Sequence, residues 1–368
     1  MNKVRPIEKE DYRALARFLE KKIEWFDVVF WIDRFTCWWD ENPAMCDGVD
    51  RGWILYEDDG KVGGAFGNIP VRYFIDGQEK IVCATTGWFM SKKSSRRALE
   101  LYHLFMTQKY PVLNTTPTEK VVQISLQMGF KQLNQPWLRE EAIYINDVSS
   151  FWKFISHKLS HHKLTLFLFQ CAGIFIVPLL KIFNTISRKR LAALDTDYTL
   201  KEIKAFDQKY TALSNKLKEK YDITAIRDHI ALNWFFFGSK MLRSSRKVVE
   251  IKNKESLIGY IGIKAGNKRR GAKTYNYLEV VDLVLIEESE PAYCAVIHGL
   301  LRLGASKDNN IVFIKTHIFN QELKKYLKRS GFFNRPAREV FLYRNFGELG
   351  LDKNFYASPL DGDRPFFP

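Results

Sequence analysis

The chain has 368 residues, which is more than one ordinary core accommodates and predicts about two domains. Its 46% apolar and 14% aromatic content excludes a mainly disordered protein. The net charge of +15 leaves three classes of partner open, namely nucleic acid, anionic lipid and an acidic substrate.

Cysteine usage and the N-terminus indicate the compartment. The five cysteines form no C-x-x-C pair and no His stands at metal-ligand spacing, which predicts free thiols, a reducing environment and no metal site. The opening residues, MNKVRPIEKEDYRAL, lack the apolar core of a signal peptide. We therefore expect a cytoplasmic protein.

The two halves of the chain follow one plan. In each half the pattern predicts the end of a strand, then an Asp, and then an amphipathic helix. A Trp-bearing helix, strands broken by Gly and finally a βαβ unit follow. The matching segments are 7–19 and 203–217, 31–43 and 226–237, 52–74 and 247–266, and 113–133 and 315–335. The offset is 196 at the start (Ile7 to Ile203) and 202 at the end (Gly129 to Gly331), and this small drift indicates a duplicated domain of α+β (mixed α/β) class.

The stretch from Thr85 to Phe130 carries the most specific pattern. An apolar strand, 81–90, enters the polar and basic loop Ser91 to Arg97, which opens into a predicted helix over 98–108. The first turn of a helix has unpaired N–H groups and a positive dipole end, so this arrangement favours phosphate binding. A short strand and a second helix, ending at Gly129-Phe130, follow.

This arrangement resembles the acyl-CoA half of a GNAT-type N-acyltransferase. The resemblance implies that the loop receives the pyrophosphate of acetyl-CoA or another acyl-CoA as cosubstrate. The family pattern is Arg or Gln, two residues, Gly, one residue, and Gly or Ala. Its nearest match is KSSRRA, which has the basic Lys93 at the first position and Arg96 in place of the Gly. The implied cofactor-binding residues are Phe89, Met90, Lys93, Ser94, Ser95, Arg96, Arg97 and Ala98. A solvated basic helix start stays open as an alternative.

The resemblance extends to two GNAT-like domains in tandem. In the second copy three carboxylates, Glu287, Glu288 and Glu290, stand where phosphates would lie, so we expect no CoA site there. We assign residues 1–147 to the CoA-binding copy, 148–196 to a connector, 197–346 to the second copy and 347–368 to a C-terminal tail. Aromatic residues of the tail, Phe355, Tyr356 and Phe366 among them, predict that it docks.

The connector combines an apolar run with a basic surround. Residues 164–180, LTLFLFQCAGIFIVPLL, carry no charge and fall at the short edge of what spans a bilayer. From Val148 to Leu194 there is no Asp or Glu, whereas Lys and Arg supply seven positive charges. We therefore expect a helical segment at an anionic membrane surface, on the inner face of the plasma membrane. A buried helix between the domains is the alternative.

Candidate site residues follow from where the resemblance places acyl-transfer chemistry. The family often has a Tyr four residues before the Gly of the Gly-Phe pair, and Ser125 occupies that position. Thr85 and Thr86 are further polar candidates on the central strand, although each such residue also suits local hydrogen bonding. The candidates are Ser125, Asn114 and Thr116 for catalysis, and Arg34, Asp40, Trp88, Asp282, His317, Asn320 and Asp363 for the substrate.

These patterns together predict an N-acyltransferase in which an amine attacks the thioester of acetyl-CoA directly. The tail resembles those of GNAT-like proteins of bacterial surface-polysaccharide synthesis, which implies an amino sugar or related amine, free or lipid-linked, as acceptor. Two alternatives stay open: an inactive GNAT-like scaffold at the membrane, and an aminoacyl transferase of the Fem type. We expect no specific nucleic-acid partner because no recognition motif is present.

Overall fold

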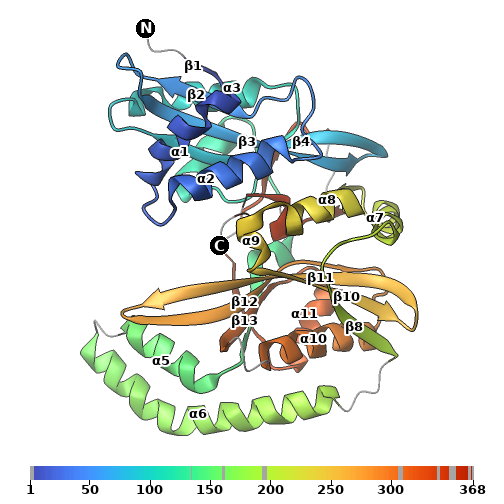
Figure 1. Cartoon of the computed structure of the whole chain (residues 1–368). Helices are drawn as coiled ribbons and strands as arrows, with labels where there is room; N and C mark the ends of the chain where they lie inside the picture. The colour runs from blue at the N-terminus through green and yellow to red at the C-terminus, as the bar shows by residue number, and fades with distance from the viewer. Residues whose placement is uncertain are drawn as a thin grey trace. The chain divides into compact units, whose positions relative to one another are not determined.

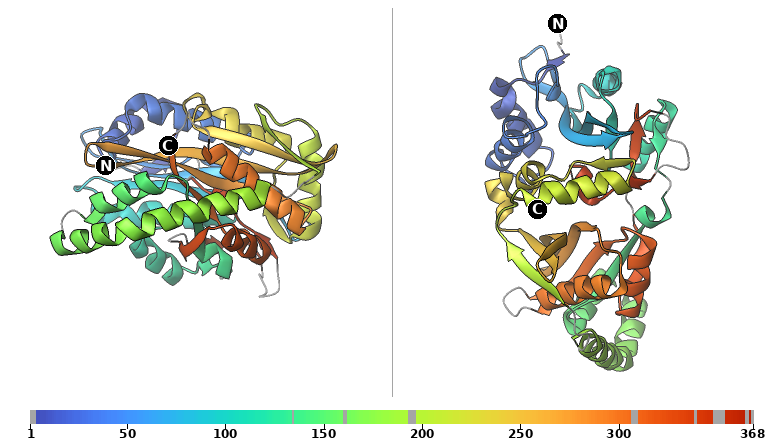
Figure 2. Two further views of the ribbon diagram at one scale, coloured as in Figure 1. Left: turned by 90° about the horizontal axis from the view of Figure 1, so that it is seen from below. Right: turned by 90° about the vertical axis from the view of Figure 1, so that its right-hand side faces the viewer.

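The computed structural model describes residues 4–133, 135–159, 162–192, 197–305, 310–337, 340–347, 354–363 and 366 (Figures 1 and 2). The chain divides into two compact units, each built from separate stretches of sequence. Unit 1 comprises residues 1–134, 205–244 and 339–367, and unit 2 comprises residues 135–204 and 245–338. These units divide the chain differently from the sequence repeat, because each takes segments from both copies.

Unit 1 is built on a nine-stranded sheet. Seven strands follow one another in the order β1-β2-β3-β4-β5-β15-β6, and β9 with β16 extends the sheet from β3. All neighbours along the seven-strand path are antiparallel except β4 and β5, which are parallel. The strands are β1 (Val4–Pro6), β2 (Gly52–Tyr56), β3 (Val62–Ile75), β4 (Gln78–Met90), β5 (Val112–Asn114), β6 (Lys131–Gln132), β9 (Ile223–Ala225), β15 (Leu342–Arg344) and β16 (Phe355–Tyr356).

Unit 2 is built on a seven-stranded sheet of the same plan. Its order is β8-β10-β11-β12-β13-β7-β14, and among these described strands only β12 and β13 are parallel. The strands are β7 (Glu140–Ile145), β8 (Tyr198–Ile203), β10 (Arg246–Asn253), β11 (Ser256–Arg270), β12 (Lys273–Leu285), β13 (Ile311–His317) and β14 (Phe333–Pro336). The repeat recognised in the sequence therefore corresponds to two sheets with one strand order.

Each sheet includes strands from the other copy, namely β9 and β15 of the second copy in unit 1 and β7 of the first copy in unit 2. In unit 1, β15 from the second copy lies between β5 and β6, and in unit 2, β7 from the first copy lies between β13 and β14. This reciprocal exchange explains why both units are discontinuous in sequence. Both ends of the connector are attached to the sheet of unit 2. Strand β7 precedes residue 148, strand β8 follows residue 196, and both strands belong to that sheet.

The helices of unit 1 repeat a local motif. Asp27 and Asp228 each accept a hydrogen bond from the backbone N–H three residues on, and so cap α2 and α8. Both helices then widen into a π-helical turn that carries buried aromatic side chains, η2 and η5. The helices are α1 (Tyr12–Glu20), α2 (Val28–Phe35), η2 (Thr36–Asp40), α3 (Ala98–Thr107), α4 (Glu119–Gln127), α7 (Lys209–Lys220), α8 (His229–Asn233), η5 (Trp234–Gly238) and α9 (Lys240–Arg243).

The helices of unit 2 include the connector. They are α5 (Val148–Leu159), α6 (Lys163–Ala192), α10 (Glu290–Ala305) and α11 (Gln321–Arg329). Figures 1 and 2 show α6 as the outermost of these helices, beside α5 and α10. Its residues 163–191 are long and apolar enough, by length and composition, to cross a membrane, and few of them are buried.

Candidate functional site

Strands β4 and β5 part in the middle of unit 1. The pairing of β4 with β3 continues to Met90, whereas its pairing with β5 covers only Cys83 and Ala84. From Thr85 onward, β4 therefore has a neighbour on one edge only among the described strands. Backbone N–H and C=O groups need partners, so the other edge offers hydrogen bonds to a ligand that enters between the strands.

A β-bulge interrupts β4 at this point. The register with β3 shifts between Ala65 and Gly67, and Gly87 on β4 has a φ of +58°. Glycine adopts this left-handed conformation without steric cost, and a bulge re-aims the groups that follow it. The backbone of Trp88, Phe89 and Met90 is thereby turned relative to the first half of the strand.

Asp363 from the C-terminal tail lies at this site. The Thr116 hydroxyl, which follows β5, donates a hydrogen bond of 2.8 Å to the Asp363 carboxylate. Burial of the carboxylate raises the pKa of Asp363 above its ordinary value, and the hydroxyls of Thr116 and Thr86 partly oppose the shift. A carboxylate held in this way is a stronger base than an exposed one.

A buried ion pair holds the tail in unit 1. Arg227, which follows β9, lies 2.9 Å from the Asp361 carboxylate, and both side chains are about 1% exposed. Arg227 also donates to the hydroxyl of Ser358, and it stacks over the ring of Tyr356. Asp361 and Ser358 cap each other's backbone in a capping box. The predicted docking of the tail is thus observed for Phe355, Tyr356 and Phe366, which are all buried.

Gly362 lets the tail approach the end of β5. A Cβ atom at this position would lie 1.7 Å from the Thr115 hydroxyl oxygen. We therefore expect Gly362→Ala to displace Asp363 and to lower the free energy of unfolding by about 1–3 kcal/mol, which is the usual cost of overpacking. Urea denaturation measures this change. Adding Thr115→Ala should restore most of the stability, and failure to do so would contradict the steric explanation.

The indole N–H of Trp88 on β4 is buried and lacks a partner among the described residues. The Thr86 hydroxyl, two residues earlier on the same strand, interacts with the Asp363 carboxylate and helps to set its pKa. Buried polar groups are normally satisfied, so the Trp88 N–H is available to a ligand that enters between the strands.

Ser125 is part of the support beneath the site. Its side chain is fully buried on α4, where its hydroxyl lies 2.6 Å from that of Tyr102 on α3 and also bonds to the Val121 carbonyl. Tyr102 in turn stacks on Trp88 with ring centroids 4.9 Å apart. Tyr102 was not among the predicted site residues, because an aromatic residue at helical spacing looks like ordinary core. The catalytic role of Ser125 stays a prediction.

The loop after β4 is ordered by a carboxylate. Glu57 accepts hydrogen bonds from Ser91 (2.7 Å) and Ser94 (2.8 Å), which lower its pKa, and Lys93 lies 3.4 Å from it. Ser95 to Arg97 form a 3₁₀ turn before α3, and Arg97 is engaged by Glu100. Arg96 is exposed and takes no part in these contacts.

A basic pocket of about 480 Å³ adjoins this loop. It lies between α1 and the turn from β2 to β3 and reaches Ser91. Its charged lining consists of Arg17, Lys21, Lys22, Lys61 and Glu57. The excess of positive charge suits a phosphorylated ligand next to the loop.

Two further predicted residues of unit 1 are held by other side chains. Arg34 on α2 is fully buried, where it pairs with Asp33 at 2.8 Å and donates to Ser239. Asp40 accepts from Tyr12 at 2.9 Å and pairs with Lys9. Asn114 is buried at the end of β5. Substrate contact by Arg34 and Asp40 stays a prediction.

The remaining predicted residues lie in unit 2, where β12 and β13 also part. Asp282 accepts a hydrogen bond of 2.5 Å from Tyr260, and His317 lies 4.0 Å from Glu279. Asn320 caps α11 through the N–H of Leu323 and donates to Tyr293. The predicted substrate set is therefore divided between the two units.

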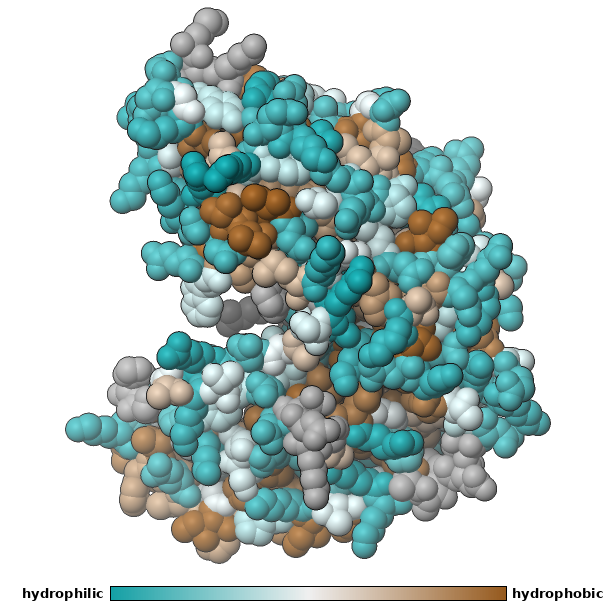
Figure 3. Space-filling view, viewed as in Figure 1, coloured by the Kyte–Doolittle hydropathy of each residue, from teal (hydrophilic) through white to brown (hydrophobic). Residues whose placement is uncertain are grey.

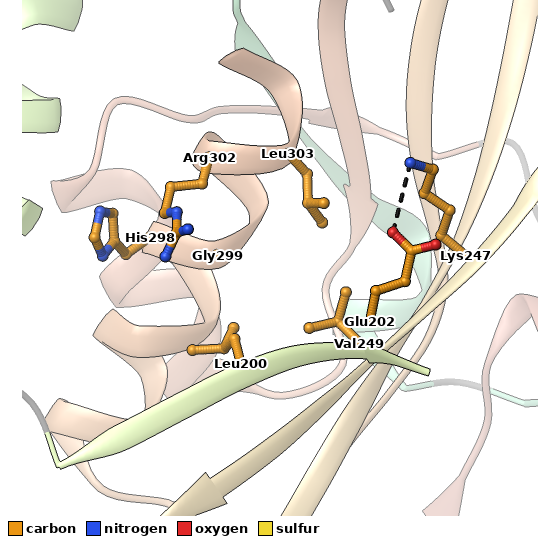
Figure 4. Close-up of a pocket in the computed structure, with 8 residues that line it drawn as sticks. All are labelled: Leu200, Glu202, Lys247, Val249, His298, Gly299, Arg302 and Leu303. Carbon is orange, nitrogen blue, oxygen red and sulfur yellow. Dashed lines mark ion pairs between the residues drawn. The ribbon is translucent and has the colours of Figure 1, made fainter. Parts of the chain in front are cut away.

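A separate pocket of unit 2 contains none of these residues. It measures about 300 Å³ and lies between α10 and the strands β8 and β10 (Figure 4). Its lining is Leu200, Glu202, Lys247, Val249, His298, Gly299, Arg302 and Leu303, with Glu202 and Lys247 paired at 3.6 Å. Burial, and then the charge of Arg302, lower the pKa of His298, which favours its neutral form. Within the described residues, no group of three or more His, Cys, Asp or Glu is placed to hold a metal.

Comparisons with solved structures identify the fold. A GCN5-related N-acetyltransferase from Anabaena variabilis is similar at a TM-score of 0.55 and 12% identity, over 94% of this chain and 73% of that chain. A conserved protein of unknown function from Enterococcus faecalis has a TM-score of 0.56 and 10% identity, over 94% and 72%. N-myristoyltransferase of Saccharomyces cerevisiae, solved with myristoyl-CoA, has a TM-score of 0.56 and 11% identity, over 98% and 83%.

No protein-family model matches the chain, and no curated protein matches it. The similarity to solved structures therefore rests on the fold, and it extends over both units. The mixed α/β fold with a two-domain GNAT-like arrangement, predicted from the sequence, is confirmed.

Proposed function

We propose that the protein is an acyl-CoA-dependent N-acyltransferase whose acyl donor binds in unit 1. The observation that carries this proposal is the parting of β4 and β5 beside a carboxylate of the tail, Asp363. The serine-rich loop and its basic pocket lie at the far end of β4, where the phosphates of CoA would be received.

The reaction needs a base and a polarised thioester. As the amine attacks the carbonyl carbon, a C–N bond forms, the amine proton passes to the Asp363 carboxylate, and the C–S bond breaks to release the thiolate of CoA. Backbone N–H groups of β4 beyond the bulge polarise the carbonyl oxygen. Thr116 orients the base, because its hydroxyl donates to the Asp363 carboxylate.

The acceptor that we propose is an amino sugar or a related amine, free or lipid-linked, in surface glycan synthesis. Trp88 supports this choice, because its buried indole N–H has no partner among the described residues and can donate to a sugar hydroxyl. Acetyl is the proposed acyl group. The similarity to N-myristoyltransferase makes longer acyl chains the first alternatives to test.

Calorimetric titration with CoA, acetyl-CoA and myristoyl-CoA tests the donor. We expect acetyl-CoA to bind at micromolar concentration, and Lys93→Glu with Arg96→Glu to weaken all three ligands about 10-fold or more by opposing the phosphates. Lys131→Glu with Lys220→Glu, at exposed positions of unit 1 away from the loop, provides the matched control. Binding of no acyl-CoA would overturn the proposal.

Two other functions are separated by the same titration. An inactive GNAT-like scaffold binds no acyl-CoA and transfers no acyl group. A Fem-type aminoacyl transferase ignores acyl-CoA and transfers the aminoacyl group of a charged tRNA. The carboxylate of Asp363 beside the parted strands favours an enzyme, since a scaffold has no need of a base at an open strand edge.

A further inference from the structure

Helix α6 exposes a continuous apolar stripe. Its large apolar residues recur every three or four positions over more than six turns, so they share one side of the helix. Eight of them are between 58% and 73% exposed: Leu164, Phe167, Leu168, Ile174, Phe175, Leu179, Ile182 and Ile186. Brown side chains accordingly gather at the lower edge of Figure 3, where α6 runs in Figure 1. We call this set the α6 stripe.

The opposite side of α6 is bound to unit 2 along its length. Near its start, Phe169 stacks on Trp152 of α5 with centroids 3.9 Å apart, and Gly173 gives the Trp152 ring room. Near its end, Asn184 donates to the Ile145 carbonyl at 2.7 Å, and Arg188 donates to the Asn146 side chain at 2.6 Å. These contacts fix which side of the helix faces outward.

This attachment distinguishes two ways of meeting a membrane. A helix that crosses the bilayer is surrounded by lipid or by other spanning segments, whereas α6 has strand and helix residues of unit 2 on one side from Phe169 to Arg188. An amphipathic helix in the interface presents one apolar side to the acyl chains and keeps the other on the protein. The arrangement of α6 fits the second geometry.

The charges around the stripe identify the kind of surface. From Val148 to Leu194 the sequence has no Asp or Glu. The exposed basic side chains of α5 and α6 are Lys153, Lys158, Lys163, Lys181, Lys189 and Arg190. Such a collar repels a cationic partner and is attracted to anionic headgroups next to an apolar interior. A protein partner could cover the α6 stripe only if it combined a long apolar groove with acidic edges, whereas an anionic bilayer has both properties.

We propose that α6 anchors the protein in the plane of an anionic lipid bilayer, with the α6 stripe buried among the acyl chains. The helix lies parallel to the surface and does not cross the bilayer. The anchor belongs to unit 2 and does not depend on the proposed acyl transfer. It therefore stands or falls separately from acyl-CoA binding.

Vesicle flotation of the full-length protein tests the anchor. We expect at least 10-fold more protein on vesicles of phosphatidylglycerol and phosphatidylcholine than on phosphatidylcholine alone. The triple variant Phe167→Glu, Phe175→Glu, Leu179→Glu should lose at least 10-fold of this binding. Because these side chains are exposed, the variant should keep its fold and its acyl-CoA affinity. Trp25→Glu with Ile230→Glu, at exposed apolar positions of unit 1, is the matched control and should bind as before.

A depth measurement decides the orientation. Exposed Cys46 and Cys171 are first replaced by serine, and single cysteines at Leu164, Phe175 and Ile186 then carry a fluorophore quenched by lipids spin-labelled at different depths. An in-plane helix gives all three positions the same depth within the headgroup and acyl boundary. Depths that progress from one side of the bilayer to the other would overturn the proposal in favour of a spanning helix. A stripe that mediates dimerisation and leaves vesicle binding unchanged when mutated would overturn it too.

Discussion

Replacing Asp363 by asparagine is expected to slow acyl transfer by about 10²–10⁴-fold while acyl-CoA still binds. This range is what a positioned general base contributes. Asparagine keeps the shape of the side chain and can still accept from Thr116, but it cannot take the amine proton. Single-turnover kinetics with saturating acyl-CoA, together with calorimetry, separate the chemical step from binding.

The pH dependence gives this prediction a second readout. The pKa of Asp363 is raised by burial, so its basic form is lost when the pH falls through a value above the ordinary Asp range. Activity of the wild-type protein should therefore decline on the acid side at a higher pH than an exposed carboxylate gives. Asp363→Asn should lack this limb, and Asp363→Glu should recover part of the rate.

The exposed Asp47 in the same unit provides the control. Asp47→Asn should leave both the rate and the pH profile unchanged. If Asp363→Asn retains more than about a third of the activity, Asp363 is not the base, and the tail then has a structural role only.

The sequence predicts the repeated plan of the fold because periodicity and glycine breaks are local signals. Ile7 follows β1 and Ile203 ends β8, and these two strands occupy the same position in the order of their sheets. The exchange of β7 and β15 was missed, because the pattern of a strand records which residues are buried and not which strand lies beside it. A duplicated chain offers each strand two equivalent partners, and sequence alone does not choose between them.

The candidate site was predicted in its parts but not in its connections. Thr116 and Asp363 were both singled out, yet 247 positions separate them and the first was assigned to catalysis and the second to the substrate. Ser125 was chosen by its position in a motif, and its bond to Tyr102 depends on the packing of α3 on α4. The apolar run of the connector was predicted over 164–180. In the structure α6 continues to Ala192, and Asn184 and Arg188 in this additional part bond to residues of unit 2.

The largest effect on stability is expected at the ion pair that holds the tail. Removing one partner of a buried pair leaves an uncompensated charge, which costs about 3–5 kcal/mol. Arg227 and Asp361 are both about 1% exposed, and Arg227 has further bonds to the Ala225 carbonyl and the Ser358 hydroxyl that depend on its position. Asp361→Ala should therefore lower the free energy of unfolding by about this amount, measured by urea denaturation.

The double variant Arg227→Met, Asp361→Leu separates charge burial from packing. Apolar side chains of similar volume often replace a buried ion pair at little cost, so the double variant should be more stable than Asp361→Ala. Its activity reports on the placement of Asp363, which lies two residues beyond Asp361. If the tail keeps its position in the double variant, stability and acyl transfer should recover together. If stability returns without activity, the ion pair positions Asp363 in addition to stabilising the fold. A single variant Asp361→Ala that unfolds like the wild type would show that the tail contributes nothing to unit 1.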